Sequence, residues 1–229
     1  MQINSFATTE RLNQHILLAL QQQLSQAVRE RGHAYLVVSG GKTPEPLFHS
    51  LARASLPWDK VICTLADERW IPPSMTDSNE LMVRSSLLQH NAAKAHFISL
   101  YSEHESLLNA VALTNERIEV LPQFDVVILG MGEDGHTASL FPDSEAIRAA
   151  MSDEVNAVAF VEPRFAPYRR ITLTKARLLN TRSIFIHLVG KQKMAVLQQA
   201  LNGDNELLMP IRAFLKHPGV DIQVMWAPC

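Results

Sequence analysis

Hydrophobic positions along the chain follow two alternating patterns. Apolar residues first recur at helical spacing between Thr9, which we expect to cap a helix, and Gly32, which ends it. The run 34–38 is then continuously apolar, as in a strand buried on both faces of a sheet. Helical and strand-like segments continue to take turns, which is typical of strands joined by crossover helices. We therefore predict an α/β fold, with a Rossmann-like, mainly parallel sheet and helices on both faces.

The same patterns place the remaining elements. A second helix is expected to be capped by Thr43, with Pro44 as its first residue, and a third to begin near Ser78. The sequence shows no repeat, linker or low-complexity segment, so a single domain over residues 1–229 is expected. Further strands are expected at 61–66, 97–100, 124–129, 155–161, 170–173, 183–189 and 221–226, and further helices at 103–121, 191–201 and 208–215.

Composition and charge narrow the class of protein. Of the 229 residues, 47% are apolar and 19% are charged, which suits a large buried core and excludes a disordered tail. The net charge of -2 and the lack of a basic block argue against a nucleic-acid partner. Cys63 and Cys229 are expected to be free thiols, as in a reducing compartment. With no apolar stretch of membrane-spanning length and no secretory start, we expect a cytoplasmic protein that does not bind membranes.

The turns after the strands hold the candidate functional residues, because ligands of open α/β sheets bind at the carboxyl ends of the strands. The first such turn is Ser-Gly-Gly-Lys-Thr-Pro at 39–44. Gly40 and Gly41 let backbone N–H groups approach an anion, and the dipole of the following helix favours one. The turn predicts a phosphate site, although two glycines before a helix also occur in plain tight turns. Its spacing does not fit the nucleotide-binding P-loop.

Charged side chains stand at the ends of other strands. Asp67, Glu68 and Arg69 follow one strand, and Arg69 can form bidentate contacts with a phosphate or a carboxylate. A solvated surface turn is the alternative for this triplet. Arg170 begins a later strand and Lys191 follows another. If these cations converge with Arg69 on the glycine turn, together they can hold a phosphate dianion.

The turn at 130–136, Gly-Met-Gly-Glu-Asp-Gly-His, carries three glycines and ends in Asp134 and His136. Ordering so many glycines is costly unless the backbone must come close to another group. The glycine spacing also matches a dinucleotide-binding turn, but Pro142 and the lack of helical period before it argue against that interpretation. Ser139 is not in a G-x-S-x-G nucleophile elbow, so a serine-esterase mechanism is not supported. We interpret this turn as a functional element built around His136.

These motifs resemble those of the short bacterial 6-phosphogluconolactonases, which are related to glucosamine-6-phosphate deaminases. In the family's order, and over most of the chain, the resemblance rests on the segments 39–44, 67–70 with 77–79, 130–142 and 170–174. The third segment, which continues Asp-Gly-His with Thr-Ala-Ser-Leu-Phe-Pro, is the most specific. Two departures are visible: Lys42 stands where the family commonly has Ser, and 74–76 lack the His or acid often found before Asp-Ser-Asn.

The resemblance implies the family's fold and an enzyme that hydrolyses 6-phospho-D-glucono-1,5-lactone to 6-phospho-D-gluconate in the oxidative pentose phosphate pathway, without a metal or organic cofactor. A lactone is an activated ester, so water needs a positioned base, a stabilised oxyanion and a proton for the leaving oxygen. His136 is the expected base. Asp134 or Asp67 is expected to fix its tautomer, and Arg69 or the N–H groups of the glycine turn to stabilise the oxyanion. The substrate phosphate is expected on Gly40, Gly41, Lys42, Thr43, Arg170 and Lys191.

Two alternatives remain open at this point. A 6-phospho-amino-sugar deaminase/isomerase shares the fold and the Asp-Gly-His core, but such relatives carry a glutamate where this chain has Phe141. A non-catalytic sugar-phosphate sensor has no use for His136 beside Asp134. The other eight histidines lack metal-ligand spacing, so no metal site is predicted. The expected partner is a small sugar-phosphate lactone, bound by a monomer or a weak homo-oligomer.

Overall fold

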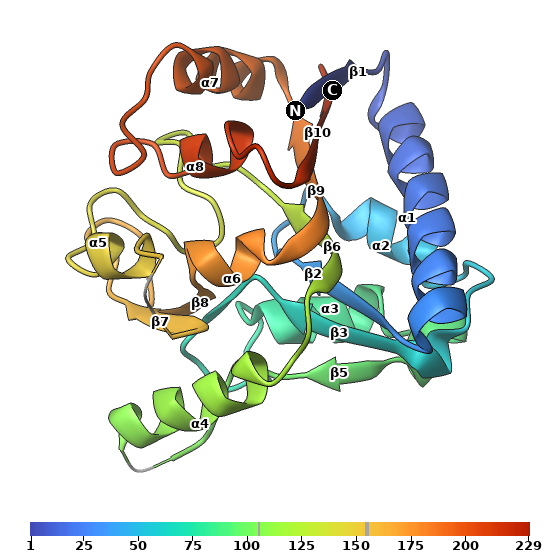
Figure 1. The fold of residues 1–229 in the computed structure, drawn as a ribbon, viewed down its shortest axis with the longest axis horizontal. Helices are drawn as coiled ribbons and strands as arrows, with labels where there is room; N and C mark the ends of the chain where they lie inside the picture. The colour runs from blue at the N-terminus through green and yellow to red at the C-terminus, as the bar shows by residue number, and fades with distance from the viewer. Residues whose placement is uncertain (105, 154–155) are drawn as a thin grey trace.

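The computed structural model describes residues 1–104, 106–153 and 156–229. Its larger sheet has seven strands, and every pairing in it is parallel. The strands are β1 (Gln2–Ser5), β2 (Ala34–Val38), β3 (Val61–Leu65), β5 (His96–Ile98), β6 (Phe124–Leu129), β9 (Thr181–Val189) and β10 (Asp221–Ala227). They lie side by side in the order β1-β10-β9-β6-β2-β3-β5 (Figure 1).

Helices cover both faces of this sheet. One side carries α1 (Thr9–Arg31) and α2 (Glu45–Leu51), and the other carries α6 (Lys175–Leu179), α7 (Lys191–Leu201) and α8 (Ile211–Leu215) (Figure 1). The predicted mainly parallel α/β architecture is confirmed. The other described helices are α3 (Asn79–Ser86), α4 (Leu107–Glu119) and α5 (Ile147–Ala150), with short 3-10 turns η1 (Trp58–Lys60) and η2 (His90–Lys94).

A smaller antiparallel sheet continues from the larger one. It contains β4 (Asp67–Arg69), β8 (Arg170–Leu173) and β7 (Val158–Val161), in the order β4-β8-β7. Ala66 joins the two sheets, because its N–H donates to the Val38 carbonyl at 2.9 Å and its carbonyl accepts the Leu173 N–H at 2.8 Å. The register of the small sheet places Arg69 directly opposite Arg170.

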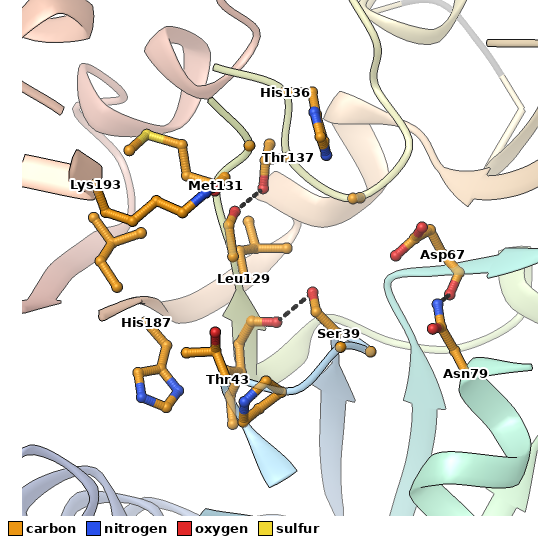
Figure 2. Close-up of a pocket in the computed structure, with 18 of the residues that line it drawn as sticks. Ser39, Thr43, Asp67, Asn79, Leu129, Met131, His136, Thr137, His187 and Lys193 are labelled. Carbon is orange, nitrogen blue, oxygen red and sulfur yellow. Dashed lines mark hydrogen bonds between the residues drawn. The ribbon is translucent and has the colours of Figure 1, made fainter. Parts of the chain in front are cut away.

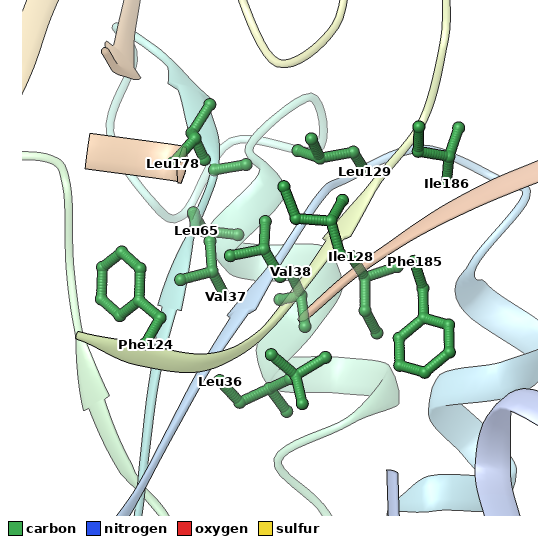
Figure 3. Close-up of a cluster of buried hydrophobic side chains, with 14 of the residues drawn as sticks. Leu36, Val37, Val38, Leu65, Phe124, Ile128, Leu129, Leu178, Phe185 and Ile186 are labelled. Atoms are coloured by element: carbon green, nitrogen blue, oxygen red, sulfur yellow. The ribbon is translucent and has the colours of Figure 1, made fainter. Parts of the chain in front are cut away.

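The core lies around the central strands of the larger sheet. All six residues of β6 are buried, and they pack with apolar side chains of β2 and β9 (Figure 3). Burying one such side chain fully contributes roughly 1.5–3 kcal/mol to folding. Burial on both faces is the reason that these strands are continuously apolar in the sequence.

The order in which successive strands are added to the sheet reverses between β2 and β6. From β2 it continues to β3 on one side, and from β6 it continues to β9 on the other. Two residue pairs, Leu36–Val126 and Val37–Val127, are in register across this seam, whereas five pairs join β2 to β3. The turns that leave the carboxyl ends of β2 and β6 therefore diverge, which is the arrangement that opens a ligand crevice in such sheets.

Two predicted helix starts are wrong. Thr8, and not Thr9, caps α1, because Thr8 has an extended backbone and its Oγ1 accepts the Arg11 N–H at 3.3 Å. Thr43 does not cap α2: Pro44 occupies the capping position, and no side chain bonds to the helix start. The helix start expected near Ser78 is confirmed: α3 begins at Asn79, and Ser78 caps it, because its side chain accepts the N–H of Leu81 at 3.2 Å.

Other boundaries differ by a few residues. The helix expected at 103–121 begins at Leu107, the one expected at 208–215 begins at Ile211, and the strand expected at 155–161 begins at Val158. Glu105 and Val155, which these predictions include, lie outside the described residues. The short elements β1, β4, α5 and α6 were not predicted, because three to five residues are too few to show a period.

Within the described ranges, no helix combines the length and the apolar composition needed to cross a membrane.

Candidate active site

A cavity of about 370 Å³ opens at the carboxyl edge of the larger sheet (Figure 2). Its walls come from the turns after β2 and β6, the end of β9, the first helical turn of α7, and residues of β4 and β8. The cavity therefore lies at the point where the strand order reverses, and side chains from segments far apart in the sequence line it.

His136 lines the upper part of this cavity in the view of Figure 2. Its Nδ1 lies 2.6 Å from Oδ1 of Asp134, and its backbone N–H donates to the same oxygen at 3.0 Å. An ionised carboxylate only accepts hydrogen bonds, so the proton is assigned to Nδ1 and the lone pair to Nε2. Nε2 has no hydrogen-bond partner in the described part of the chain, which leaves it available to a ligand.

Asp134 is 45% exposed at its side chain and does not itself line the cavity. Partial burial raises the pKa of Asp134, but the hydrogen bonds and the charge of His136 lower it by more, so the pKa lies below its ordinary value of 3.8. The group is a carboxylate in neutral solution. It is therefore placed to fix the tautomer of the imidazole and to stabilise an imidazolium.

Glycines of the turn after β6 make room for this pair. A Cβ at Gly132 would lie 2.1 Å from His136 Nδ1 and 2.6 Å from Asp134 Oδ1, so no side chain fits there. Gly135 adopts φ +78°, in the left-handed region that favours glycine. The turn closes on itself, because the Gly132 N–H donates to the His136 carbonyl at 2.8 Å. This explains why the sequence is dense in glycine at this point.

Phe141 packs against the imidazole and also lies near a cation. The ring centroids of Phe141 and His136 lie 4.4 Å apart. The guanidinium carbon of Arg170 lies 5.9 Å from the centroid of the Phe141 ring. A chain of contacts therefore joins Arg170 through Phe141 to His136.

Asp67 also lines the cavity but does not contact the imidazole. It is buried, and its Oδ2 accepts the hydroxyl of Ser139 at 2.5 Å. Of the two carboxylates expected beside His136, the structure thus brings Asp134 into hydrogen-bond contact and places Asp67 with Ser139. Asp67 lies at the start of β4, where its carboxylate lines the cavity away from the imidazole (Figure 2).

Three cations line the cavity, namely Arg69, Arg170 and Lys193. Burial lowers the pKa of Arg170, while the carboxylate of Asp67 opposes that shift. Lys193 Nζ donates to the carbonyl of Met131 at 2.8 Å. In residues 1–104, 106–153 and 156–229, none of the three lies within 4 Å of a carboxylate oxygen. Asp67 is the one acidic residue of the lining, so an excess of two positive charges faces the cavity, which suits a phosphate dianion.

The glycine turn after β2 forms another wall. Gly40, Gly41 and Thr43 line the cavity, and Gly41 adopts φ +96° in the left-handed region. Ser39 ties this turn to the neighbouring strand, because its hydroxyl donates to the Ile128 carbonyl at 3.0 Å (Figure 2). Lys42 is exposed and does not line the cavity, so the departure from the family's Ser lies outside the lining.

Lys191, the expected cation after β9, is exposed at the first position of α7 and does not reach the cavity lining. Lys193 does, because it lies two residues further along the first turn of the same helix. The sequence did indicate a lysine of the site after this strand, since both Lys191 and Lys193 follow it. Only the orientation of α7 separates them.

Asn79 and His187 also line the cavity and were not singled out from the sequence. Asn79 belongs to the quoted Asp-Ser-Asn segment, which was a usable signal. His187 lies on β9 with both ring nitrogens buried and unpartnered, and burial lowers its pKa to about 4, so its ring is neutral. No pattern around His187 distinguishes it from a core histidine. Over the described ranges, no group of three His, Cys, Asp or Glu side chains is arranged to hold a metal ion.

Comparison with known proteins gives one consistent family. The model of glucosamine-6-phosphate isomerases/6-phosphogluconolactonase matches residues 7–226. The 6-phosphogluconolactonase of Pseudomonas aeruginosa is 41% identical over 210 residues, which cover 90% of this chain and 86% of that protein. The crystal structure of a 6-phosphogluconolactonase from Shewanella baltica is 42% identical and superimposes with a TM-score of 0.96, covering 99% of this chain and 97% of that one.

A more distant neighbour shares the fold alone. The structure of a monomeric glucosamine-6-phosphate deaminase superimposes with a TM-score of 0.82 at 18% identity, covering 99% of this chain and 97% of that one. This likeness shows that the two proteins share the architecture and no more. On these grounds the chain belongs to the family of glucosamine-6-phosphate isomerases and 6-phosphogluconolactonases.

Proposed function

We propose that this protein hydrolyses 6-phospho-D-glucono-1,5-lactone to 6-phospho-D-gluconate, the lactonase step of the oxidative pentose phosphate pathway. One observation carries the proposal: the same cavity is lined by an imidazole that a carboxylate orients and by three cations that have no ion-pair partner among the described residues. The pair suits attack of water on an ester carbon, and the cations suit a phosphate at the other end of the substrate. The two similar proteins above 40% identity, from Pseudomonas aeruginosa and Shewanella baltica, are 6-phosphogluconolactonases, which supports the choice of ester.

In the proposed reaction, Nε2 of His136 takes a proton from a water molecule as its oxygen attacks C1 of the lactone. The imidazolium is stabilised by Asp134 through the 2.6 Å contact at Nδ1. Collapse of the tetrahedral intermediate breaks the bond from C1 to the ring oxygen, and His136 returns the proton to that oxygen. The product is an open-chain carboxylic acid, which ionises in neutral solution.

The cations are assigned by their contacts. Arg69 is hydrogen-bonded to Asn79, which packs against Gly40, so we assign Arg69 to the phosphate with Gly40, Gly41, Thr43 and Lys193. The phosphate held there positions C1 and contributes binding energy remote from the reacting bond.

Arg170 is assigned to the negative oxygen that develops on C1, because contacts join it through Phe141 to the imidazole. The N–H groups of Gly132 and Gly135 already donate within their own turn, which argues against them as the oxyanion donors.

The alternative is a deaminase acting on a 6-phospho-amino sugar. The observation that bears on it is Phe141, whose ring packs on His136 where those relatives carry a glutamate. A phenyl ring has no proton to exchange with a ring oxygen or an amine, so ring opening lacks its acid. We therefore favour the lactonase.

Acid release from freshly generated 6-phosphogluconolactone tests the proposal, with glucosamine 6-phosphate as the comparison substrate. We expect turnover of the lactone only. His136→Ala is expected to lose on the order of 100-fold in kcat and to keep its affinity for 6-phosphogluconate. His49→Ala, which removes an exposed imidazole of α2, is the matched control and is expected to retain full activity. Wild-type turnover in His136→Ala, or ammonia release from glucosamine 6-phosphate, overturns the proposal.

A further inference from the structure

Asn79 is the first residue of α3 and is buried, yet it lines the cavity. Its side-chain amide bonds to both ends of β4. Oδ1 accepts NH1 of Arg69 at 2.6 Å, and Nδ2 donates to the backbone carbonyl of Asp67 at 2.9 Å (Figure 2 draws the second bond). One amide group therefore connects the strand that carries the pocket carboxylate with the side chain of a pocket cation.

The backbone of Asn79 is held in place independently of its side chain. Glu68, fully buried on the strand between those two residues, accepts the Asn79 N–H at 2.7 Å and the Ser78 hydroxyl at 2.9 Å. The same carboxylate accepts the backbone N–H of Arg69 at 2.7 Å. The start of α3 is thus anchored to β4, and the two hydrogen bonds of the amide then hold the Asn79 side chain in its direction.

The amide also fills the space against the glycine turn. A Cβ built on Gly40 would lie 1.9 Å from Oδ1 and 2.2 Å from Cγ of Asn79. The backbone of Gly40 is not in the left-handed region, so position 40 requires glycine because of this close approach and not because of its conformation. Asn79 therefore sits between the glycine turn and Arg69.

The hydrogen bonds to Arg69 leave one edge of its guanidinium free. Both acceptors, Oδ1 of Asn79 and the carbonyl of Asp77 at 2.8 Å, bind NH1. Nε and NH2 have no partner in residues 1–104, 106–153 and 156–229. A guanidinium edge of two parallel N–H groups matches two oxygens of a phosphate, provided that the plane is held in the right orientation.

We propose that Asn79 is a positioning residue, which fixes the guanidinium of Arg69 beside the glycine turn so that its Nε–NH2 edge meets the substrate phosphate. The proposal rests on the proposed function for the identity of the substrate. It concerns the phosphate end only, so it can be tested on binding as well as on turnover.

The test is a double-mutant cycle between Asn79→Ala and Arg69→Ala. The dissociation constants of inorganic phosphate and of 6-phosphogluconate are measured by calorimetry, and KM and kcat with the lactone. We expect Asn79→Ala to weaken both ligands and to raise KM by roughly tenfold, with kcat near wild type, as for loss of a hydrogen bond to a charged group. In the Arg69→Ala background, the same substitution should change these constants by less than about twofold, because Asn79 acts through Arg69.

A second cycle uses the space at Gly40. Gly40→Ala is expected to weaken phosphate binding in the wild type, since the methyl group displaces the Asn79 amide. In the Asn79→Ala protein it should have no further effect, because the space is then free. Asn91→Ala is the matched control: it removes a side-chain amide that donates to the Arg53 carbonyl, and it should leave every constant unchanged.

Unchanged phosphate binding in Asn79→Ala overturns the proposal. A double mutant whose dissociation constant rises by the product of the two single-mutant fold-changes overturns it as well, because the two residues then act independently. Should Asn79→Ala not fold, Asn79→Ser keeps a hydroxyl at the helix start and carries the same cycle. Absence of lactone turnover with an intact phosphate-binding cycle rejects the proposed function and leaves the role of Asn79 standing. Turnover without coupling between the two residues rejects the role of Asn79 alone.

Discussion

Gly132→Ala is expected to abolish most of the catalysis while leaving the phosphate end of the site intact. The new methyl carbon falls 2.1 Å from Nδ1 and 2.2 Å from Cε1 of His136, and 2.6 Å from Oδ1 of Asp134. Since the methyl group presses on both members of the pair, neither can yield without changing their contact. The three atoms nearest to it all belong to this pair, and none belongs to the cations or to the glycine turn after β2.

The size of the effect follows from the displacement. To reach an ordinary contact of at least 3.4 Å from the present 2.1 Å, the ring must withdraw by about 1.3 Å, or the backbone of the turn must move by a similar amount. A misplacement of about 1 Å typically costs on the order of 100-fold in rate when the reacting geometry depends on it. We therefore expect kcat for the lactone to fall about 100-fold, with the dissociation constant of 6-phosphogluconate within about threefold of wild type.

The assay combines steady-state lactone hydrolysis with calorimetric titration of 6-phosphogluconate. Gly219→Ala serves as the control, because Gly219 is exposed before β10 and a Cβ there meets His217 at 3.2 Å and no part of the cavity. It should retain wild-type kcat. A Gly132→Ala enzyme with wild-type kcat refutes the argument that the glycine exists to admit the imidazole.

Three other expectations can be checked with simple variants. Lys193→Ala should raise KM at least tenfold and Lys191→Ala by less than twofold, because the first lines the cavity and the second does not; equal effects contradict the placement. Partial burial raises the pKa of Asp134, but bonding to the imidazole lowers it by more, so this carboxylate stabilises the fold above pH 3.8 and its contribution disappears as pH falls through the lowered value. Urea unfolding should show a stability gap to Asp134→Asn at pH 5 that shrinks below pH 3.8, and a gap that widens there is inconsistent with the shift. Arg177→Met should lower the free energy of unfolding by about 2–4 kcal/mol with activity retained, because the buried guanidinium donates to the Pro122 carbonyl at 2.9 Å; an unchanged urea midpoint contradicts this.

The sequence predicted the elements in which every residue has a similar degree of burial. β2 and β6 are buried on both faces, so their apolar runs identified them directly. β4 was missed because Asp-Glu-Arg has no strand pattern, and its pairing with β8 is made by residues about a hundred positions away. The cap of α1 was misplaced by one residue, because Thr8 and Thr9 have the same side chain and only the backbone angles decide between them.

The candidate site divides in the same way. The contact between Asp134 and His136 is local, within one turn, and was among the expected pairings. The placement of Asp67 with Ser139 depends on two distant segments, and the sequence left it open. Asn79 shows most clearly what the sequence alone does not predict, because its contacts with Gly40 and Arg69 exist only after three separate segments have come together.

The seam between β2 and β6 also links ligand binding to the integrity of the whole sheet. Two pairs in register hold its halves together there, and the cavity takes one wall from the turn on each side. A molecule that spans those walls binds only when both halves are assembled, so occupancy opposes their separation, by about 2.7 kcal/mol at a concentration 100 times the dissociation constant. Amide protons of β2 and β6 should then exchange more slowly with deuterium in the loaded protein, which makes this seam a reporter of a bound sugar phosphate.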